Sequence, residues 1–70
     1  MLIIDRSVGQ RIAFYRKVIG LKQYKLAGRV GMQKESLNRI EVGKSITKLP
    51  TLVRIASELG VTLDELLGKE

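Results

Sequence analysis

The stretch that decides the fold is residues 23–43, QYKLAGRVGMQKESLNRIEVG. Its first half predicts a short helix, because Leu26, Ala27 and Val30 have the spacing that places side chains on one helical face. Gly31 follows directly, and glycine adopts the left-handed conformation that ends many helices without steric cost. We therefore expect a short helix that stops at a tight turn.

The second half of the stretch predicts another short helix, from about residue 34 to residue 42, after a three-residue turn. Leu37 and Ile40 form its apolar edge, and Gly43 ends it. The other face is polar and carries Gln33, Lys34, Glu35, Ser36, Asn38 and Arg39. Almost all of these side chains can hydrogen-bond to base edges or phosphates of a nucleic acid.

A further helix is predicted before this stretch, from Ser7 to about Ile19. Ser7 and Gln10 have the spacing of a capping box, in which each side chain satisfies a free amide at the helix start. The apolar face of this helix follows the 3.6-residue period and consists of Val8, Ile12, Tyr15 and Ile19. Gly20 then ends the helix.

Two helices are predicted after the central stretch. Pro50 suits the first turn of the earlier one, where no amide donor is needed, and Gly60 ends it. Its apolar stripe consists of Leu49, Leu52, Ile55, Ala56 and Leu59. Thr62 and Glu65 form a second capping box, which starts a short helix that Gly68 closes. The sequence thus predicts an all-α domain of five short helices over residues 7–67.

Two apolar features fall outside this core. Residues 1–6 begin with MLII, which is either an arm that packs on the body or on a second subunit, or a frayed terminus. Phe14 and Val18 lie four residues apart on a side of their helix different from the core face. This pair either lines an interface between subunits or covers a neighbouring loop.

The composition limits the possible chemistry. Seventy residues allow one small domain. With no Cys and no His, disulfides, thiolate zinc sites and imidazole ligands are excluded. No Gly-rich phosphate loop or metal-ligand spacing is present, and the acidic residues are scattered. We expect neither an enzyme nor a bound cofactor or metal. No apolar run is long enough for a membrane span, and the start does not resemble a signal peptide.

The charge is distributed unevenly. Residues 1–48 contain eleven Lys and Arg against three Asp and Glu, for a net charge of +8. Residues 49–70 contain two Lys and Arg against four Asp and Glu, for a net charge of −2. The basic part therefore coincides with the pair of short helices. A basic face on a small domain indicates a polyanionic partner, although charge alone fits a merely solvated surface equally well.

The chain resembles the lambda-repressor-like Cro/repressor (Xre) family of bacterial and phage helix-turn-helix regulators. The likeness spans about residues 8–67. It rests on Gln10-Arg11-Ile12, Arg16, Gly20-Leu21, Gln23, Leu26-Ala27, Val30-Gly31, Ser36, Arg39-Ile40-Glu41, Gly43-Lys44 and LVRIASELGVTLDELL. It is specific because many spaced positions agree at once. The resemblance implies a compact five-helix DNA-binding domain whose third helix enters the major groove.

This chain departs from the family pattern at the starts of both short helices. Lys22 and Gln33 stand where the family usually has a capping Ser or Thr, which forgoes about 1 kcal/mol at each helix. Gly28 lies inside the first of them, where glycine costs about 1 kcal/mol relative to alanine. We therefore expect packing, more than intrinsic propensity, to hold that helix.

The polar face of the second short helix contains the candidate base-reading residues. Lys34 and Arg39 can donate to guanine, and Asn38 can pair with adenine. Glu35 can accept from cytosine N4, or can simply pair with Lys34 or Arg39. Gln33, freed from capping, can also point at DNA. The alternative for the whole face is an ordinary solvated helix surface.

Other residues are expected to hold the phosphate backbone. In the family a glutamine at the position of Gln23 clamps a phosphate, and we carry that role over. The further phosphate candidates are Lys22, Tyr24, Lys25, Ser36, Lys44 and Arg16. Arg16 and Glu41 also occupy positions that form a partly buried ion pair in the family, which implies a structural role that orients Arg16 toward the DNA backbone.

These inferences predict a sequence-specific regulator of transcription, a repressor, that binds inverted-repeat double-stranded DNA as a homodimer. The protein is expected to be bacterial or phage-encoded and cytoplasmic, and associated with the nucleoid when bound. The dimer surface is the last short helix with its loop, the MLII arm or Phe14 and Val18, and the sequence does not choose among them. Three alternatives stay open. An antitoxin of the same fold would bind a toxin through an apolar arm and repress its own operon. A pure protein-interaction module would keep the fold without DNA binding. A membrane-surface protein would need one basic amphipathic helix, whereas here the basic residues are spread over three.

Overall fold

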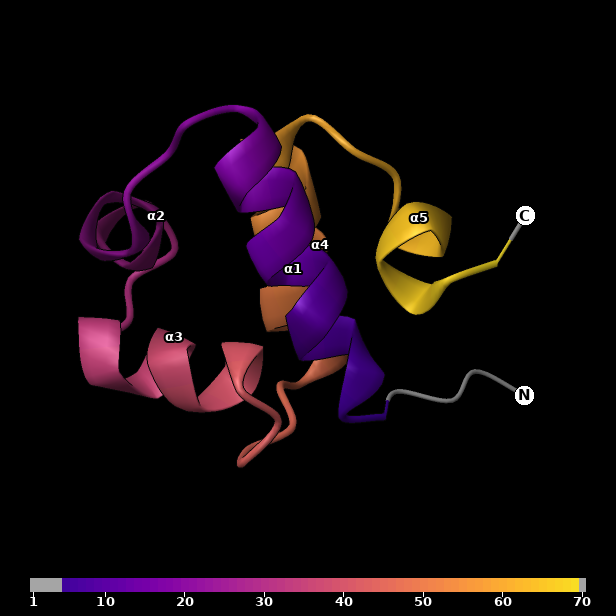
Figure 1. The fold of residues 1–70 in the computed structure, drawn as a ribbon, viewed down its shortest axis with the longest axis horizontal. Helices are drawn as coiled ribbons and strands as arrows, with labels where there is room; N and C mark the ends of the chain where they lie inside the picture. Colours follow the sequence, from indigo (N-terminus) through magenta and orange to yellow (C-terminus); the bar gives the residue numbers. More distant parts are fainter. Residues whose placement is uncertain (1–4, 70) are drawn as a thin grey trace.

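The computed structural model describes residues 5–69, which fold into five helices (Figure 1). Their bounds agree with the expected ones to within about a residue. They are α1 Ser7–Val18, α2 Gln23–Arg29, α3 Lys34–Glu41, α4 Leu49–Leu59 and α5 Leu63–Leu67. The all-α, five-helix prediction is confirmed, and the MLII segment falls at residues 1–4, outside the described part. None of the helices in residues 5–69 is long and apolar enough to cross a membrane.

Helix α1 is the centre of the arrangement. It contacts α3, α4 and α5, while α2 packs against α3 and α4. In Figure 1, α2 and α3 lie on one side of the α1–α4 pair and α5 lies on the other. The two helices of the central stretch are therefore supported from behind by α1 and α4, and their other faces are left open.

The core fills the space between these helices and follows the predicted apolar faces. Each helix contributes buried apolar side chains, and the ones with almost no exposed surface are Ile12, Leu26, Leu37, Leu52, Ile55 and Leu66. Tyr15 and Leu21 are partly buried against this cluster. Two residues of the predicted apolar faces are not in the core. Ile19 is 53% exposed, because α1 ends at Val18 and the chain turns away there. Leu49 is 38% exposed and is the first residue of α4.

The turn and cap signals in the second half of the chain are confirmed. Gly31 has φ +75°, as expected for the turn between α2 and α3. Pro50 lies in the first turn of α4, and Gly60 ends that helix in the left-handed conformation. At α5, the Thr62 hydroxyl accepts from the Glu65 amide, and the Glu65 carboxylate accepts from the Thr62 amide. Neither Lys22 nor Gln33 makes a side-chain cap.

The predicted capping box at the start of α1 is wrong. Ser7 is already the first helical residue, and Arg6 before it makes no side-chain cap. The Asp5 carboxylate satisfies the Ser7 amide instead. Oδ1 of Asp5 accepts a hydrogen bond from the Ser7 amide at 2.9 Å and another from the Ser7 hydroxyl. Both hydrogen bonds lower the pKa of Asp5 below its ordinary value, and the one from the Ser7 hydroxyl has the larger effect. A carboxylate accepts from a free amide more strongly than a hydroxyl does, so Asp5 takes the role predicted for the Ser7 side chain, while the helix still begins at Ser7 as expected.

Candidate nucleic-acid interface

A hollow of about 500 Å³ opens on the face formed by α2, α3 and the loop that follows α3. All of the residues that line it are candidates from the sequence: Gln23, Lys34, Glu35, Asn38, Arg39 and Lys44. The lining contains three cationic side chains and one carboxylate. The fold thus brings the start of α2, the outward face of α3 and the basic residue after Gly43 to one place.

Five further candidates are exposed on the surface of the same two helices. They are Ser36 on α3, Gln33 directly before α3, and Lys22, Tyr24 and Lys25 at the start of α2. Within residues 5–69 the ion pairs are Arg16–Glu41 and Arg29–Glu58. Glu35 therefore forms no ion pair with Lys34 or Arg39 in the described chain, and its carboxylate faces the hollow free of a cationic partner.

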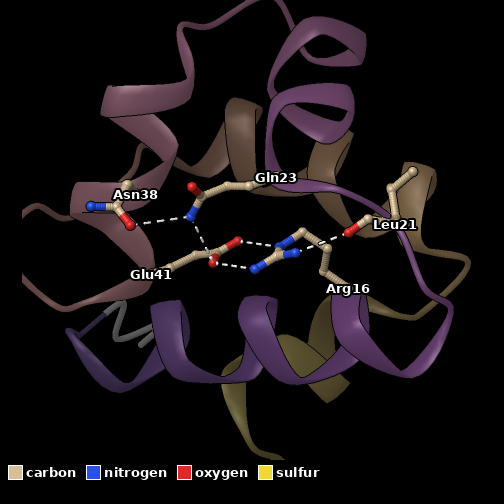
Figure 2. A network of polar contacts seen from close by, with 5 residues as sticks. All are labelled: Arg16, Leu21, Gln23, Asn38 and Glu41. Carbon is tan, nitrogen blue, oxygen red and sulfur yellow. Dashed lines mark hydrogen bonds and ion pairs between the residues drawn. The ribbon is translucent and has the colours of Figure 1, made fainter.

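A buried ion pair lies directly behind the hollow and joins α1 to α3 (Figure 2). Arg16 Nε donates to Glu41 Oε2 at 2.7 Å, and Arg16 Nη2 donates to Glu41 Oε1 at 2.8 Å. The third nitrogen, Nη1, donates to the Leu21 carbonyl at 2.9 Å. The hydrogen bonds to Glu41 raise the pKa of Arg16. A two-pronged contact of this kind fixes both the distance and the orientation of the two helices.

This geometry supports the structural role given to Arg16. Its side chain is only 11% exposed, and each of its three guanidinium nitrogens donates a hydrogen bond within the protein. Nη1 and Nη2 each have a second hydrogen, so the phosphate role also given to Arg16 stays a prediction.

The side chain of Gln23 connects this ion pair to the surface. Its Nε2 donates to Glu41 Oε1 at 3.0 Å and to Asn38 Oδ1 at 3.2 Å. An amide nitrogen has two hydrogens, so both donors are used inside the protein. The phosphate role carried over to Gln23 stays a prediction, and these contacts describe its side chain in the absence of DNA. The Gln23–Asn38 contact could not be expected from the sequence, since the two residues are fifteen positions apart.

These features together define a class of protein. An exposed polar helix, held by a second helix across a glycine turn and bordered by lysines, matches the way such pairs dock in the major groove. The fold is that of the helix-turn-helix domains of DNA-binding transcriptional regulators.

The comparisons with known proteins give the family. The helix-turn-helix family model HTH_3 matches residues 12–66, and the chain belongs to this family. Over 63 residues, 90% of this chain, it is 32% identical to the cryptic phage CTXphi transcriptional repressor RstR of Vibrio cholerae. The match spans 56% of that repressor, so the chain corresponds to little more than half of its length.

Solved structures agree on the arrangement of the helices. The restriction-modification controller protein C.AhdI from Aeromonas hydrophila superposes with a TM-score of 0.80 and 28% identity, over 86% of this chain and 91% of that one. The N-terminal DNA binding domain of SinR from Bacillus subtilis gives a TM-score of 0.81 and 32% identity, over 89% and 91%. The lambda-repressor-like fold expected from the sequence is confirmed.

Proposed function

We propose that the chain represses transcription by inserting α3 into the major groove of a specific double-stranded DNA site. The observation that carries this proposal is the hollow, where the polar face of α3 meets the start of α2 and Lys44. The major groove is wide enough for an α-helix. A helix that is buried on one side and exposes hydrogen-bonding side chains on the other can contact the base edges there. Because its target is DNA of a bacterium or a phage, the protein acts in the bacterial cytoplasm.

The base-reading residues in this proposal are those on the outward face of α3. Lys34 and Arg39 donate to guanine, and Gln33 bonds a base near the helix start. Glu35 accepts from cytosine N4, which its lack of an ion pair to Lys34 or Arg39 supports. Each such contact discriminates against a wrong base by about 1–3 kcal/mol.

The phosphate-binding residues in this proposal surround that face. Lys44 lines the hollow, and Lys22, Tyr24 and Lys25 at the start of α2 are exposed, as is Ser36 on α3. Contacts of this type set affinity and register but carry no sequence information. They also release counterions from DNA, so each lysine that contacts a phosphate adds about 0.9 to the slope of log affinity against log salt.

A homodimer on an inverted repeat completes the proposal. Two-fold symmetry would place the two α3 helices about 34 Å apart, one turn of DNA. Phe14 and Val18 support an interface on α1, because they are 61% and 66% exposed and lie one helical turn apart. Exposed apolar pairs of this size are typical of surfaces that are covered in an assembly.

The test is a selection from random double-stranded oligonucleotides, followed by fluorescence anisotropy at two salt concentrations. We expect an inverted repeat to emerge. Lys34→Ala should change the preferred base at one position in each half-site, whereas Lys25→Ala should weaken all sites alike and reduce the salt slope. Absence of binding at low salt would contradict the proposal and leave the helix pair as scaffold. Sedimentation of the DNA complex would show whether two chains bind each site.

A further inference from the structure

The orientation of the Gln23 amide is dictated by the ion pair behind it. Glu41 is held as a carboxylate by Arg16, and a carboxylate only accepts hydrogen bonds. The Gln23 atom that lies 3.0 Å from Glu41 Oε1 must therefore be the nitrogen. With the amide turned over, two oxygens would face each other at that distance with no hydrogen between them, and the orientation is fixed by this repulsion.

The same reasoning fixes the orientation of Asn38. The second hydrogen of Gln23 Nε2 points at the Asn38 side chain, 3.2 Å away, and the atom there must be an acceptor, Oδ1. The amino group Nδ2 of Asn38 is then turned away from Gln23 and toward the surface, as Figure 2 shows. If Asn38 turned over, two amino groups would face each other, and both would lose a partner. The charge of Arg16 thus determines, through Glu41 and Gln23, which Asn38 atom is presented outward.

We propose that Gln23 is a positioning residue that makes Asn38 a hydrogen-bond donor toward DNA, so that Asn38 reads guanine. This inference rests on the proposed function and refines it. Guanine shows two adjacent acceptors, N7 and O6, in the major groove, whereas adenine and cytosine each show an amino group. The pairing with adenine expected from the sequence needs both the oxygen and the nitrogen of Asn38. Gln23 already uses one of the two lone pairs of that oxygen and holds it on the side away from the amino group that faces outward, so a base that offers only acceptors is favoured over adenine.

The first step of the test locates the base pair that Asn38 contacts. Binding sites are selected from random oligonucleotides with the wild-type chain and with Asn38→Ala, and the position that loses its preference in the variant is the contact. We expect the wild type to prefer guanine there over adenine by roughly 5- to 150-fold, the range of one good base contact. Asn38 is exposed and lies outside the core, so its variants keep the fold.

The second step tests the role of Gln23. Gln23→Met keeps the length of the side chain and removes both amide hydrogens, which frees Asn38 to present either atom. We expect adenine to become acceptable at the Asn38 position, with the other positions of the site unchanged. Lys25→Met is the matched control, because it removes a charge from the same helix and leaves the Gln23–Asn38 hydrogen bond in place. It should weaken every site by the same factor.

Asn38→Asp provides an independent check if Gln23→Met lowers the melting temperature too far. Its carboxylate can still accept from Gln23, and its outward atom is then an acceptor. We expect guanine to be replaced at that position by a base with an amino group, adenine or cytosine. The base selected at this position thereby reports which atom of residue 38 faces the DNA. A merely structural role of Gln23 would not change that base.

The outcomes separate this inference from the proposed function. If the wild type selects no site, the proposed function fails and the inference fails with it. If a site is selected, three results overturn the inference alone: a wild-type preference for adenine or cytosine at the Asn38 position, no position that responds to Asn38→Ala, or equal weakening of all sites by Gln23→Met. The last result would assign Gln23 to the phosphate clamp that the family resemblance implies.

Discussion

Gly9 on α1 lies directly against the carbonyl group of Ile40 on α3. A Cβ atom added to Gly9 would lie 1.7 Å from the Ile40 oxygen and 2.6 Å from the Ile40 carbonyl carbon. Both distances are far inside van der Waals contact. Because the obstacle is backbone, it cannot move aside as a flexible side chain could. The absence of a side chain at Gly9 therefore sets how closely α1 approaches the helix proposed to read DNA.

We predict that Gly9→Ala destabilises the protein strongly, although alanine favours a helix more than glycine does. The added methyl must push α1 and α3 apart, and overpacking of this kind costs about 1–3 kcal/mol or more. A thermal or urea unfolding experiment measures the loss. Unchanged stability would mean that the two helices separate easily and that the close approach has no energetic role.

Gly28→Ala is the matched control, and its expected effect is opposite. Gly28 lies inside α2, and an added Cβ would meet no atom within 4 Å. We therefore predict a gain of about 0.5–1 kcal/mol, because alanine loses less backbone entropy than glycine on forming a helix. The same unfolding experiment measures it. A loss of stability would show that α2 needs glycine for a reason that its surroundings do not reveal.

We predict that Glu41→Gln costs about 3–5 kcal/mol of unfolding free energy. The side chains of Arg16 and Glu41 are 11% and 5% exposed, and the substitution leaves the guanidinium charge buried without its counter-charge. The midpoint of urea denaturation should fall accordingly. A melting temperature equal to that of the wild type would contradict the structural role assigned to this pair.

The double variant Arg16→Met, Glu41→Leu should be more stable than Glu41→Gln alone. Removing both charges also removes both desolvation penalties, and apolar replacements of similar volume are often neutral. The three proteins can be compared in one series of urea titrations. If the double variant is the least stable of the three, the hydrogen bonds of Arg16, including the one to the Leu21 carbonyl, outweigh the cost of burying the charges.

We predict that the cap at Asp5 makes stability depend on pH in the acid range. Hydrogen bonds from Ser7 lower the pKa of the Asp5 carboxyl in the folded state. The stabilisation is therefore present above the unfolded pKa of about 3.9 and is lost as the pH falls through the lower folded value. Melting temperatures of the wild type and Asp5→Ala should differ by a constant amount near neutral pH and converge in strong acid.

Asp5→Asn distinguishes the charge from the hydrogen bond at this cap. Its side-chain oxygen can still accept from the Ser7 amide, but it does not titrate. Asp5→Asn should therefore be closer in stability to the wild type than Asp5→Ala is, with a contribution that does not change with pH. A gap between wild type and Asp5→Ala that stays constant into strong acid would contradict the assignment of Asp5 as the cap.

Local signals explain why the sequence predicted the helices so closely. The spacing of Leu26, Ala27 and Val30, the left-handed Gly31 and the Thr62–Glu65 capping box each act within one or two turns of helix. Where two local signals competed, the prediction was wrong. Both Asp5 and Ser7 have side chains that can accept from a free amide at the start of α1, and Asp5 is the one that does.

The contents of the candidate site were also predictable in part. Helical periodicity sufficed to place the polar residues of α3 on one face, and all six residues that line the hollow were candidates. Their mutual contacts were not predictable. The sequence did not reveal that Arg16 donates to the Leu21 carbonyl as well as to Glu41.

The sequence by itself determined the class of fold, the five helices and the residues available on the surface of α3, because periodicity, caps and glycine stops are local properties of the chain. Only the tertiary structure decided how close α1 and α3 lie at Gly9, and which way the amides of Gln23 and Asn38 are turned. The physical reason is that steric overlap and hydrogen-bond polarity depend on atoms from different helices, which the order of residues does not bring together.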